Sequence, residues 1–385
     1  MNAGPGESGS LRILMVNDQP PGRGGGVEVH LTRLTAGLVA LGHFVDHFSP
    51  SRPHQGVRRI ADLWDPRAAA ELRTALVGFD VVHVHNFLRE LSPSVLSRGT
   101  IGSCPGRVVT IHDHRLFQFD RPRPHLMRWH EVSRFAYAVQ KTAAKFASHG
   151  ARHLIKRNVD RTIATSEELA SELAYVGIPA TVIHPCGVDV YVEPLAPRGR
   201  MILYAGRLAK SKGIHILIEA CAGLPPGLGA SLVIAGSGPD ETWLRGLVPE
   251  TCGATIHFVG DVAEAEVQSL LAESTVACLP SIDAEGWPLF VVEAMSAGRP
   301  VVVSDHPSLN AMVGGKVRGI VVPPNNVYRL RSALEQLLSD ATLAARLGGA
   351  GREYASSTLS PGHAIDRTIA VYRGAIALRN ERTQR

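Results

Sequence analysis

The sequence has few cysteines and no long hydrophobic run. Its 385 residues include five cysteines, which are scattered and form no Cys-x-x-Cys motif. An odd, scattered set argues against a disulfide framework or a cysteine-based zinc site and favours a reducing compartment. No run of about 18 apolar residues occurs, and the N-terminal MNAGPGESGS lacks the apolar core of a signal peptide. We therefore expect a cytoplasmic protein without a membrane-spanning helix.

The sequence also lacks a large excess of charge of one sign. The chain has 40 Lys and Arg against 35 Asp and Glu, a net charge of +5, and no Lys/Arg block. This balance fits phosphate-bearing ligands or an acidic membrane surface better than duplex DNA, so no nucleic-acid partner is expected. The length suggests two domains, and a hydrophobic content of 45% is enough for two cores.

Short apolar runs alternate with longer amphipathic segments in both halves of the chain. This pattern predicts an α/β protein made of two doubly wound, Rossmann-like domains with parallel sheets. The strands expected in the first half are 11–17, 44–50, 81–85, 107–113, 161–166 and 181–185. Those expected in the second half are 201–208, 230–238, 254–260, 275–281, 300–305 and 319–324.

A segment rich in Pro, Gly and charge, 189–200, reads as the linker between the domains. We predict an N-terminal domain over 1–195 and a C-terminal domain over 196–361. Helices are expected in 325–357, and the last segment, 362–385, is expected to form a helix that can pack back on the first domain. Ligands of open α/β sheets bind at the carboxyl ends of the strands, which predicts a site in a cleft between the two sheets.

The stretch EGWPLFVVEAMSAGRP carries two glutamates, Glu285 and Glu293, eight positions apart. Proline is tolerated only in the first turn of a helix or before it. Pro288 therefore predicts a helix start, with Glu285 on the preceding loop and Glu293 inside a helix that ends at Gly298. Both carboxylates are then expected around one helix N-terminus, where backbone N–H groups attract an anion.

The stretch GRLAKSKG places Arg207 and Lys212 between a strand and a helix. Two cations there can meet a diphosphate. Unit charges about 4 Å apart interact by roughly 4 kcal/mol at an effective dielectric constant of about 20, whereas a helix N-terminus adds up to about 2 kcal/mol. The cations could stabilise a departing diphosphate without a metal ion, and the chain has no Asp-x-Asp pair. The alternative is that both side chains only solvate a loop.

A glycine-rich loop, NDQPPGRGGGVEVHLTRL, joins the first strand to the first helix. Its consecutive glycines, including Gly25 and Gly26, let the backbone approach a ligand closely. The spacing lacks the third glycine of a dinucleotide fingerprint, although Asp46 lies on the second strand. We favour a loop that contacts phosphate or sugar, with plain turn geometry as the alternative.

Two histidine pairs occur at strand period, His83/His85 and His112/His114, and each pair is expected to share a face. A zinc site is one interpretation, but no supporting cysteine or carboxylate spacing accompanies it. His112 is expected at a strand's carboxyl end, so we favour it as a polar contact in the cleft, with a structural hydrogen bond as the alternative.

Together and in this order, GGGVEVH, TIHDH, AGRLAKSKG and EGWPLFVVE resemble the retaining glycosyltransferases of family 4, which have the GT-B fold. The stretch IHPCGVD is similar to the family's Pro-Asn-Gly-Val-Asp. This sequence departs from the family in having Cys186 where Asn is usual, Trp287 for a common Phe and Pro288 for a common Gly. The resemblance covers nearly the whole chain.

The resemblance implies transfer of a sugar from a nucleoside-diphosphate sugar to a hydroxyl group of a small natural product, glycan, lipid or sugar phosphate. It implies retention of the anomeric configuration, no cofactor and no metal. For the phosphates, it implies contacts from Arg207 and Lys212, from the amides of Leu289 and Phe290 on the distal phosphate, and from Gly25 and Gly26, which close over the phosphates. For the rest of the donor, it implies that Glu285 and His112 contact the transferred sugar, that Glu293 binds the ribose, and that Trp287 and Pro288 line the donor pocket. Glu28 is implied to face the acceptor.

Three other functions use the same features. A nucleotide-sugar epimerase would bind the same ligand, a nicotinamide-dependent oxidoreductase would use the glycine-rich loop and Asp46, and a carbohydrate-binding protein would need no catalysis. Separately, residues 126–158 combine basic side chains with helical apolar spacing. We interpret this segment as a solvated basic face, with weak peripheral contact to anionic lipid as the alternative.

Overall fold

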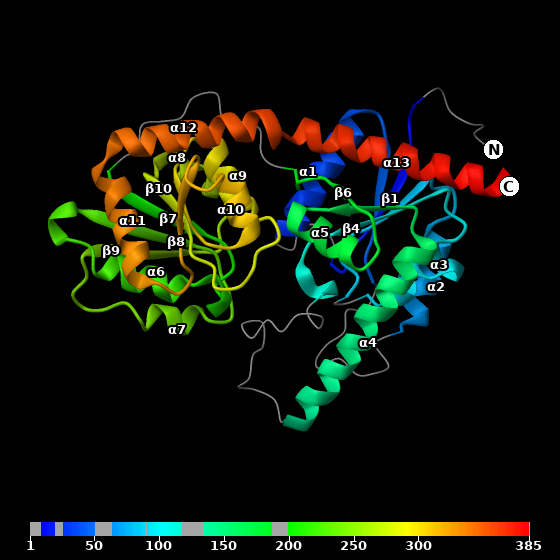
Figure 1. Ribbon diagram of the computed structural model, residues 1–385, viewed down its shortest axis with the longest axis horizontal. Coiled ribbons are helices and arrows are strands. Elements are labelled where there is room, and N and C mark those ends of the chain that lie inside the picture. The colour runs from blue at the N-terminus through cyan, green and yellow to red at the C-terminus, as the bar shows by residue number, and fades with distance from the viewer. Residues whose placement is uncertain are drawn as a thin grey trace. The chain divides into compact units, whose positions relative to one another are not determined.

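The structure is a computed structural model, which describes residues 9–19, 26–50, 64–88, 91–117, 134–186 and 199–384. The chain forms two compact units: unit 1 comprises Met1–Cys186 and Pro361–Arg385, and unit 2 comprises Gly187–Ser360. Each unit is a six-stranded parallel sheet flanked by helices (Figure 1). The boundary predicted near residue 195 and most of the expected linker lie outside the described residues.

Unit 1 has the strand order β2-β1-β3-β4-β5-β6. The strands are β1 (Arg12–Val16), β2 (Phe44–Phe48), β3 (Val81–Val84), β4 (Gly106–Ile111), β5 (Arg161–Ala164) and β6 (Thr181–Val182). The helices are α1 (Gly26–Ala40), α2 (Pro66–Ala75), α3 (Arg98–Ile101), α4 (Arg134–Asn158), α5 (Glu167–Tyr175) and α13 (Pro361–Gln384), with 3-10 turns η2 (Pro93–Leu96) and η3 (His114–Leu116). All six strands expected in this half are present.

Alternate side chains along the strands of unit 1 point to opposite faces of its sheet, and a hydrophobic core covers each face. Ile13 and Met15 of β1 pack with buried residues of α1 and α13, whereas Leu14 and Val16 pack on the other face with residues of α2, α4 and α5. Successive strand side chains point to opposite faces, so both must be apolar when helices cover both. The helix expected near the C-terminus is therefore a part of unit 1, and Tyr372 is among its fully buried side chains.

Unit 2 has the strand order β12-β11-β10-β7-β8-β9. Its strands are β7 (Met201–Ala205), β8 (Ala230–Ala235), β9 (Ala254–Gly260), β10 (Val276–Leu279), β11 (Val301–Ser304) and β12 (Gly319–Val322). Its helices are α6 (Ile214–Ala222), α7 (Glu241–Arg245), α8 (Glu264–Glu273), α9 (Leu289–Ser296), α10 (Pro307–Val313), α11 (Val327–Ser339) and α12 (Ala341–Thr358), with 3-10 turns η5 (Lys210–Lys212) and η6 (Pro226–Leu228). The six strands expected in this half and the helices expected within 325–357 are all present.

The strand orders locate one topological switch point in each sheet. In unit 1 the chain reverses its direction of travel between β1 and β3, and in unit 2 between β7 and β10. Adjacent connections leave toward opposite faces at such a point, which opens a crevice at the carboxyl ends of the two strands. The loops after these four strands are therefore the places to examine for a ligand site.

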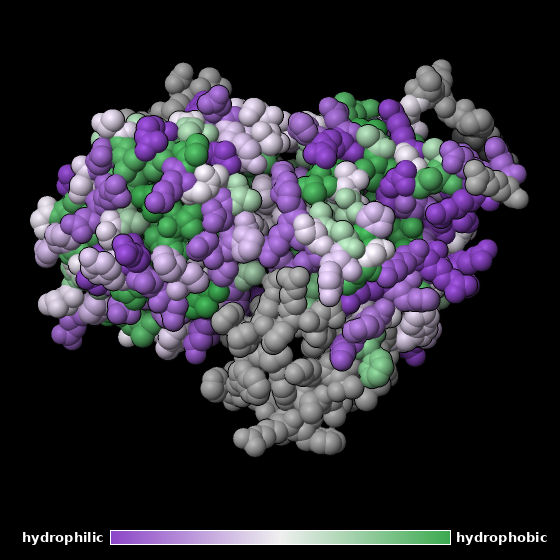
Figure 2. Space-filling model, in the orientation of Figure 1, coloured by the Kyte–Doolittle hydropathy of each residue, from purple (hydrophilic) through white to green (hydrophobic). Residues whose placement is uncertain are grey.

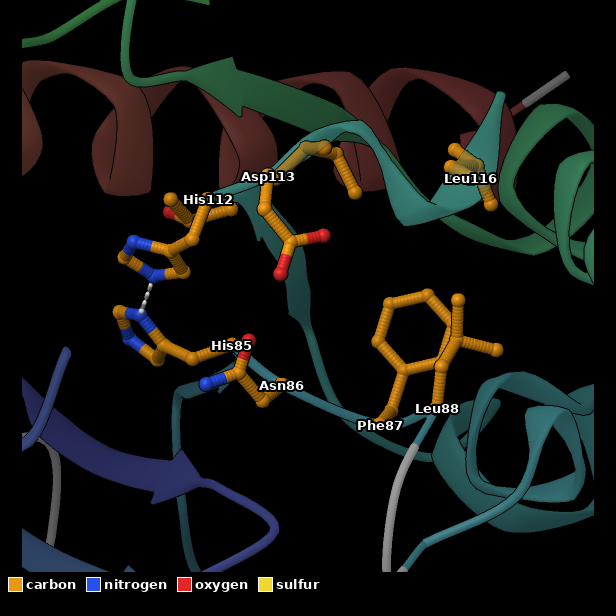
Figure 3. Close-up of a pocket in the computed structure, with 9 residues that line it drawn as sticks. His85, Asn86, Phe87, Leu88, His112, Asp113 and Leu116 are labelled. Carbon is orange, nitrogen blue, oxygen red and sulfur yellow. Dashed lines mark hydrogen bonds between the residues drawn. The ribbon is translucent and has the colours of Figure 1, made fainter. Parts of the chain in front are cut away.

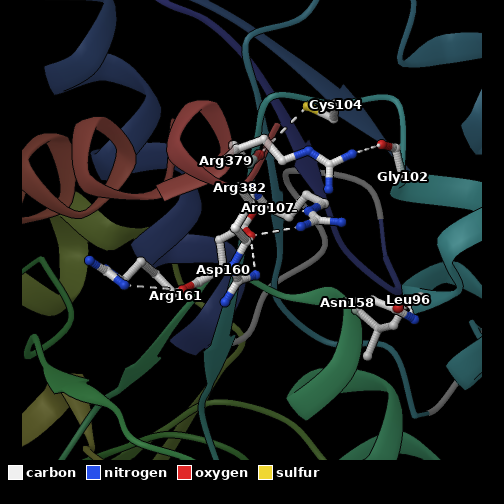
Figure 4. A network of polar contacts seen from close by, with 10 residues as sticks. Leu96, Gly102, Cys104, Arg107, Asn158, Asp160, Arg161, Arg379 and Arg382 are labelled. Carbon is white, nitrogen blue, oxygen red and sulfur yellow. Dashed lines mark hydrogen bonds and ion pairs between the residues drawn. The ribbon is translucent and has the colours of Figure 1, made fainter. Parts of the chain in front are cut away.

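A buried ion pair lies at the other end of the unit 1 sheet, at the amino ends of β4 and β5. Arg107 at the start of β4 donates two hydrogen bonds to the carboxylate of Asp160, at 2.8 Å and 2.7 Å (Figure 4). From α13, Arg379 donates to the carbonyl of Gly102 at 2.7 Å, and Arg382 lies 3.5 Å from Asp160. These contacts join the C-terminal helix to the amino end of the sheet.

The basic segment expected in 126–158 is described only from residue 134, as α4. The described part of this helix presents mostly hydrophilic side chains on the face shown in Figure 2. Lys145, Lys156 and Arg157 of this helix are exposed. Arg152 differs, because it is buried and donates to the carbonyl of Leu116 at 2.6 Å. None of the described helices is long and apolar enough to cross a membrane.

Candidate functional site

The loop after β7 carries the first predicted cation. Gly206 follows the strand with φ of 151°, a conformation that side chains disfavour, and Arg207 next to it is exposed. The carbonyl of Arg207 accepts a hydrogen bond from the hydroxyl of Tyr204 at 2.9 Å. Burial, with a smaller effect from Glu285, raises the pKa of Tyr204 far above its usual value. The phenol is thus a neutral donor that fixes the backbone at Arg207.

Close approach of two backbones brings the loop after β7 against the loop after β10. Gly213 ends η5 in a left-handed conformation with φ of 68°. A Cβ at this position would lie 2.0 Å from the carbonyl oxygen of Pro280, so only glycine fits. The amide of Ile282 also donates to the carbonyl of Ser211 at 2.8 Å. The switch point of unit 2 is therefore closed by direct contacts between its two loops.

This contact pairs the second predicted cation with a predicted acid. Nζ of Lys212 lies 2.7 Å and 2.8 Å from the two carboxylate oxygens of Glu285. The hydroxyl of Ser281 donates to the same carboxylate, and the hydroxyl of Ser308 donates to the backbone carbonyl of Glu285 at 2.6 Å. Glu285 lies on a loop, as predicted. Its carboxylate is thus held in place by two partners.

The helix predicted after Pro288 is α9, and Pro288 is its N-cap residue. The amides of Leu289 and Phe290 are the first two of the helix, where an α-helix offers no internal acceptor. The helix ends at Ser296, two residues before Gly298, whose φ is 69°. Glu293 lies inside the helix as predicted and is buried. The polar groups near the start of α9 are therefore placed as the proline spacing predicts.

Two aromatic side chains connect α9 with the strand end. The ring centroids of Tyr204 and Phe290 lie 6.3 Å apart, and Trp287 is buried in the same core cluster. Tyr204 in turn fixes Arg207. The loop after β7, which carries Arg207 and Lys212, thus meets the loop after β10, which carries Glu285 and leads into α9, at the switch point of unit 2.

The switch point of unit 1 is also polar. Asn17 and Asp18 follow β1 and are buried, and the side chain of Asn17 donates to Glu28 at 3.3 Å and accepts from the amide of Asn86 at 3.3 Å. Glu28 is half-buried in the first turn of α1. Gly26 is the exposed first residue of this helix, whereas Gly25 lies outside the described residues. Asn17 and Asp18 were not predicted, although polar residues directly after an apolar strand were a usable signal.

A cluster of histidines lines this edge. Nδ1 of His85 lies 3.0 Å from Nε2 of His112, and both rings line a pocket together with Asn86, Asp113 and Leu116 (Figure 3). The ring of His83 packs against that of His85 in a tilted arrangement, with 4.0 Å between the ring centroids. His30 of α1 completes the cluster at 5.6 Å from His112. His112 lies at the carboxyl end of β4, as predicted, and makes the structural hydrogen bond that was the alternative, whereas its contact with a ligand stays a prediction. His30 was missed because a helix contributes it.

Burial keeps these imidazoles neutral. It lowers the pKa of His30, His83 and His112 to about 3, with neighbouring histidines adding a smaller effect. The pKa of His85 is lowered well below its usual value for the same reason. At neutral pH each ring therefore has one N–H donor and one acceptor nitrogen.

His30, His85 and His112 have ring nitrogens within 4.8 Å of one another, as a metal site would require. Their surroundings do not fit a metal, however. The backbone amide of Cys186 donates to Nδ1 of His30 at 3.0 Å. A histidine that binds metal through Nε2 carries its proton on Nδ1 and donates it to a supporting acceptor, and the Cys186 amide is a donor. The cluster is better described as a hydrogen-bonded array.

The second predicted pair does not share a face. β4 ends at Ile111, and His114 begins η3, where its Nδ1 lies 2.8 Å from the carboxylate of Glu172. The period-two rule applies only while the backbone stays extended, so the prediction for His112 and His114 was wrong. His83 and His85, by contrast, do lie together.

The five cysteines all carry free thiols in the structure. Burial raises the pKa of Cys186 to about 12, so its thiol stays protonated at neutral pH and is a poor nucleophile. Neither disulfide bonding nor thiolate chemistry is built into the site.

Comparison with known proteins shows the family of the chain. The family described as Glycosyltransferase Family 4 matches residues 24–191, and Glycosyl transferases group 1 matches residues 192–354. The chain is 28% identical over 401 aligned positions to glycogen synthase of Mycobacterium tuberculosis, covering 95% of each chain.

Two solved structures share the fold. Sucrose-phosphate synthase from Thermosynechococcus elongatus superposes with a TM-score of 0.73 at 20% identity, covering 95% of this chain and 100% of that one. An Anabaena protein solved in complex with UDP-glucose superposes with a TM-score of 0.67 at 19% identity, covering 94% and 98%. The sheets and these matches define a glycosyltransferase of the GT-B fold. The chain belongs to glycosyltransferase family 4.

Proposed function

We propose that this glycosyltransferase moves a sugar from a nucleoside-diphosphate sugar to a hydroxyl acceptor, with retention of the anomeric configuration and without a metal ion. The observation that carries the proposal is the Lys212–Glu285 pair at the switch point of unit 2, beside Arg207 and the start of α9. It supports a ligand that presents both phosphate and hydroxyl groups. The UDP-glucose complex of the Anabaena protein adds support for such a donor.

The cations are proposed to bind the diphosphate. An ammonium group has three donors, and Lys212 directs Nζ at two oxygens of Glu285, which leaves capacity for a phosphate oxygen. At an effective dielectric constant of about 20, one cation about 4 Å from a phosphate charge contributes roughly 4 kcal/mol. The amides of Leu289 and Phe290 add up to about 2 kcal/mol at a helix N-terminus. Arg207 and Lys212 are therefore the main stabilisers of the departing diphosphate.

The carboxylates are proposed to accept hydrogen bonds from hydroxyl groups of the donor. A carboxylate accepts two hydrogen bonds side by side, which matches a cis-diol. Glu293 is assigned to the ribose and Glu285 to the transferred sugar, with Trp287 and Pro288 shaping the donor pocket. From unit 1, Gly25 and Gly26 are assigned to the phosphates, His112 to the donor sugar and Glu28 to the acceptor.

The proposed reaction is a substitution on one face of the sugar. The bond between the anomeric carbon and the diphosphate oxygen breaks as the acceptor oxygen approaches from the same side. The acceptor's proton passes to the departing diphosphate oxygen, and the new glycosidic bond forms at the oxocarbenium-like carbon. Arg207 and Lys212 act as electrostatic catalysts, because they stabilise charge that develops on the leaving group.

Two measurements test the proposal. Thermal unfolding with uridine, guanosine, adenosine and thymidine diphosphates should reveal at least one that stabilises the protein, by about 2.7 kcal/mol at 100 times its dissociation constant. Incubation of the matching nucleotide sugar with EDTA and an acceptor panel should then yield a product with the donor's anomeric configuration. Rapid conversion of the donor alone to an isomer would show an epimerase instead, and activity that requires magnesium or manganese would refute the metal-free mechanism.

A further inference from the structure

His85 and His112 share one hydrogen bond at the carboxyl ends of neighbouring parallel strands. Nδ1 of His85 lies 3.0 Å from Nε2 of His112, and Figure 3 shows the bond joining the two rings. Both rings are neutral because burial lowers both pKa values. One of the two nitrogens must therefore donate and the other accept, and the choice fixes the tautomer of both rings.

Burial indicates which nitrogen donates. Nε2 of His85 is buried and has no hydrogen-bond partner among the residues that the structure describes. If His112 donated, a neutral His85 would carry its proton on Nε2 and leave a buried N–H donor unpaired. Unpaired buried N–H groups are rarer in native proteins than under-satisfied acceptors. The favoured arrangement has His85 donating from Nδ1, which leaves a bare acceptor nitrogen at Nε2.

The same choice sets what His112 offers to a ligand. Its Nε2 accepts from His85, so a neutral His112 must carry its proton on Nδ1. Within the described parts of the chain no hydrogen bond to this nitrogen is found, and the ring lines the pocket with Asn86 and Asp113. We propose that His85 is a positioning residue that holds the ring of His112 and fixes its tautomer, so that Nδ1 of His112 is an N–H donor toward an oxygen of the bound substrate.

Residues behind His85 hold it in place. The ring of His83 lies against it with a centroid separation of 4.0 Å. Both nitrogens of His83 are engaged, at 2.7 Å with the hydroxyl of Tyr372 and at 2.7 Å with that of Thr110. His83 therefore cannot turn freely, and Tyr372 connects the array to α13. The C-terminal helix α13 thus supports His83, a side chain 289 residues earlier in the chain.

The inference on the tautomer can be tested without substrate. Nitrogen-15 NMR of the histidine-labelled full chain distinguishes the Nδ1–H from the Nε2–H tautomer through imidazole nitrogen–proton correlations. We expect His112 to be the Nδ1–H tautomer at pH 7.5, whereas Nε2–H predominates in free neutral histidine. In His85→Phe, we expect His112 to change to the Nε2–H tautomer. An Nε2–H tautomer of His112 in the unaltered protein would overturn the inference.

The kinetic consequence rests on the proposed contact of His112 with the donor sugar. We expect His85→Phe to lower kcat by about 100-fold, the effect of a misplaced contact, with donor KM changed less than threefold. His85→Asn, which keeps a side-chain amide donor near the Nδ1 position, should recover most of the activity. His83→Phe is the matched control, because it removes two buried hydrogen bonds but keeps a ring against His85. We expect the stability of this variant to fall, its kcat to stay within threefold of the unaltered protein and the tautomer of His112 to remain the same.

The outcomes separate the two proposals. A tautomer change in His85→Phe with unaltered kcat would refute the sugar contact assigned to His112 and leave the positioning by His85 intact. Equal losses of kcat in His83→Phe and His85→Phe, with His112 unchanged in tautomer, would mean that both residues are only structural and would overturn the inference. Thermal unfolding of each variant checks that the measured protein is folded.

Discussion

Nζ of Lys212 contacts both carboxylate oxygens of Glu285, at 2.7 Å and 2.8 Å, across 73 residues of sequence. The side chains of the pair are 28% and 12% exposed. An ion pair with this access to solvent contributes roughly 0–1 kcal/mol to stability, so its main effect is on the site. It holds an ammonium group at the switch point of the unit 2 sheet, beside the start of α9.

Lys212→Ala should lower turnover far more than it weakens nucleotide binding. The cation is proposed to stabilise charge that grows as the diphosphate departs, so its removal should cost about 10²- to 10³-fold in kcat. The dissociation constant of the free nucleoside diphosphate should rise less than tenfold. Lys210→Ala is the matched control, because Lys210 is an exposed lysine of the same 3-10 turn and its Nζ lies over the ring of Trp243. Equal losses in kcat and binding for Lys212→Ala would show that it only holds the ligand.

Glu293→Gln should weaken donor binding through the ribose. An amide oxygen accepts from hydroxyl groups less strongly than a carboxylate, and hydrogen bonds to charged groups contribute about 1.5–3 kcal/mol. We expect the affinity for the best nucleoside diphosphate to fall by roughly 10- to 100-fold, as measured by calorimetry. The 2′,3′-dideoxynucleotide, which lacks both hydroxyl groups assigned to Glu293, should bind the variant and the unaltered protein with similar affinity. A variant that loses affinity equally for both nucleotides would argue against the ribose contact. Glu273→Gln, an exposed change on α8, is the control.

The histidine cluster of unit 1 predicts a loss of stability in mild acid. Burial lowers the pKa of His30, His83 and His112 to about 3, below their ordinary value of 6.5. Between these values the unfolded chain binds more protons than the folded one, so the free energy of unfolding falls as pH drops below 6.5 and is insensitive to these groups above it. Each histidine should contribute about 1 kcal/mol of loss between pH 6.5 and 5.5.

Urea unfolding at pH 7.5, 6.5 and 5.5 measures this dependence. His83→Asn should flatten the curve, because one titrating group is removed, whereas His149→Gln, a change at an exposed position of α4, should leave it unaltered. A free energy of unfolding that is constant from pH 7.5 to 5.5 would contradict the burial of neutral imidazoles.

Apolar runs were a reliable guide to the sheets because each parallel strand is buried on both faces. The run 254–260 coincides with β9, and each of the other predicted runs overlaps one observed strand. Their predicted ends often extended too far. The run 81–85 includes His85, which is buried but lies just beyond β3. Polar residues directly after a strand belong to the ligand-facing loops, and hydrophobicity alone does not separate them from the strand.

The partners of the site residues were harder to predict than the residues themselves. Proline and glycine placed Glu285, Pro288 and Glu293 correctly because these residues constrain the local backbone. No local pattern, however, pairs Lys212 with Glu285, since the pairing depends on how the loops after β7 and β10 meet. His85 likewise bonds with His112 on the neighbouring strand, which follows from strand order and not from spacing within one run.

The pair of Arg107 and Asp160 supports a last prediction, on stability without loss of activity. Their side chains are 4% and 0% exposed, and two hydrogen bonds join them. Arg107→Met should leave the buried carboxylate with only the backbone amide of residue 107, at 3.2 Å, and the more distant Arg382. Loss of the partner of a buried charge costs about 3–5 kcal/mol. Arg382→Met is the matched control: this side chain is 60% exposed and 3.5 Å from Asp160, so its loss should cost less than about 0.5 kcal/mol.

Arg107 lies at the start of β4 and His112 just beyond its end, so about five residues of strand, roughly 16 Å, separate them. Below its unfolding temperature, Arg107→Met should therefore keep kcat and donor KM within twofold. Urea unfolding and steady-state kinetics on the same preparations check both expectations. A loss of activity in fully folded Arg107→Met would show that the amino edge of the sheet influences the site, whereas a stability change as small as that of Arg382→Met would mean that the buried carboxylate finds other partners.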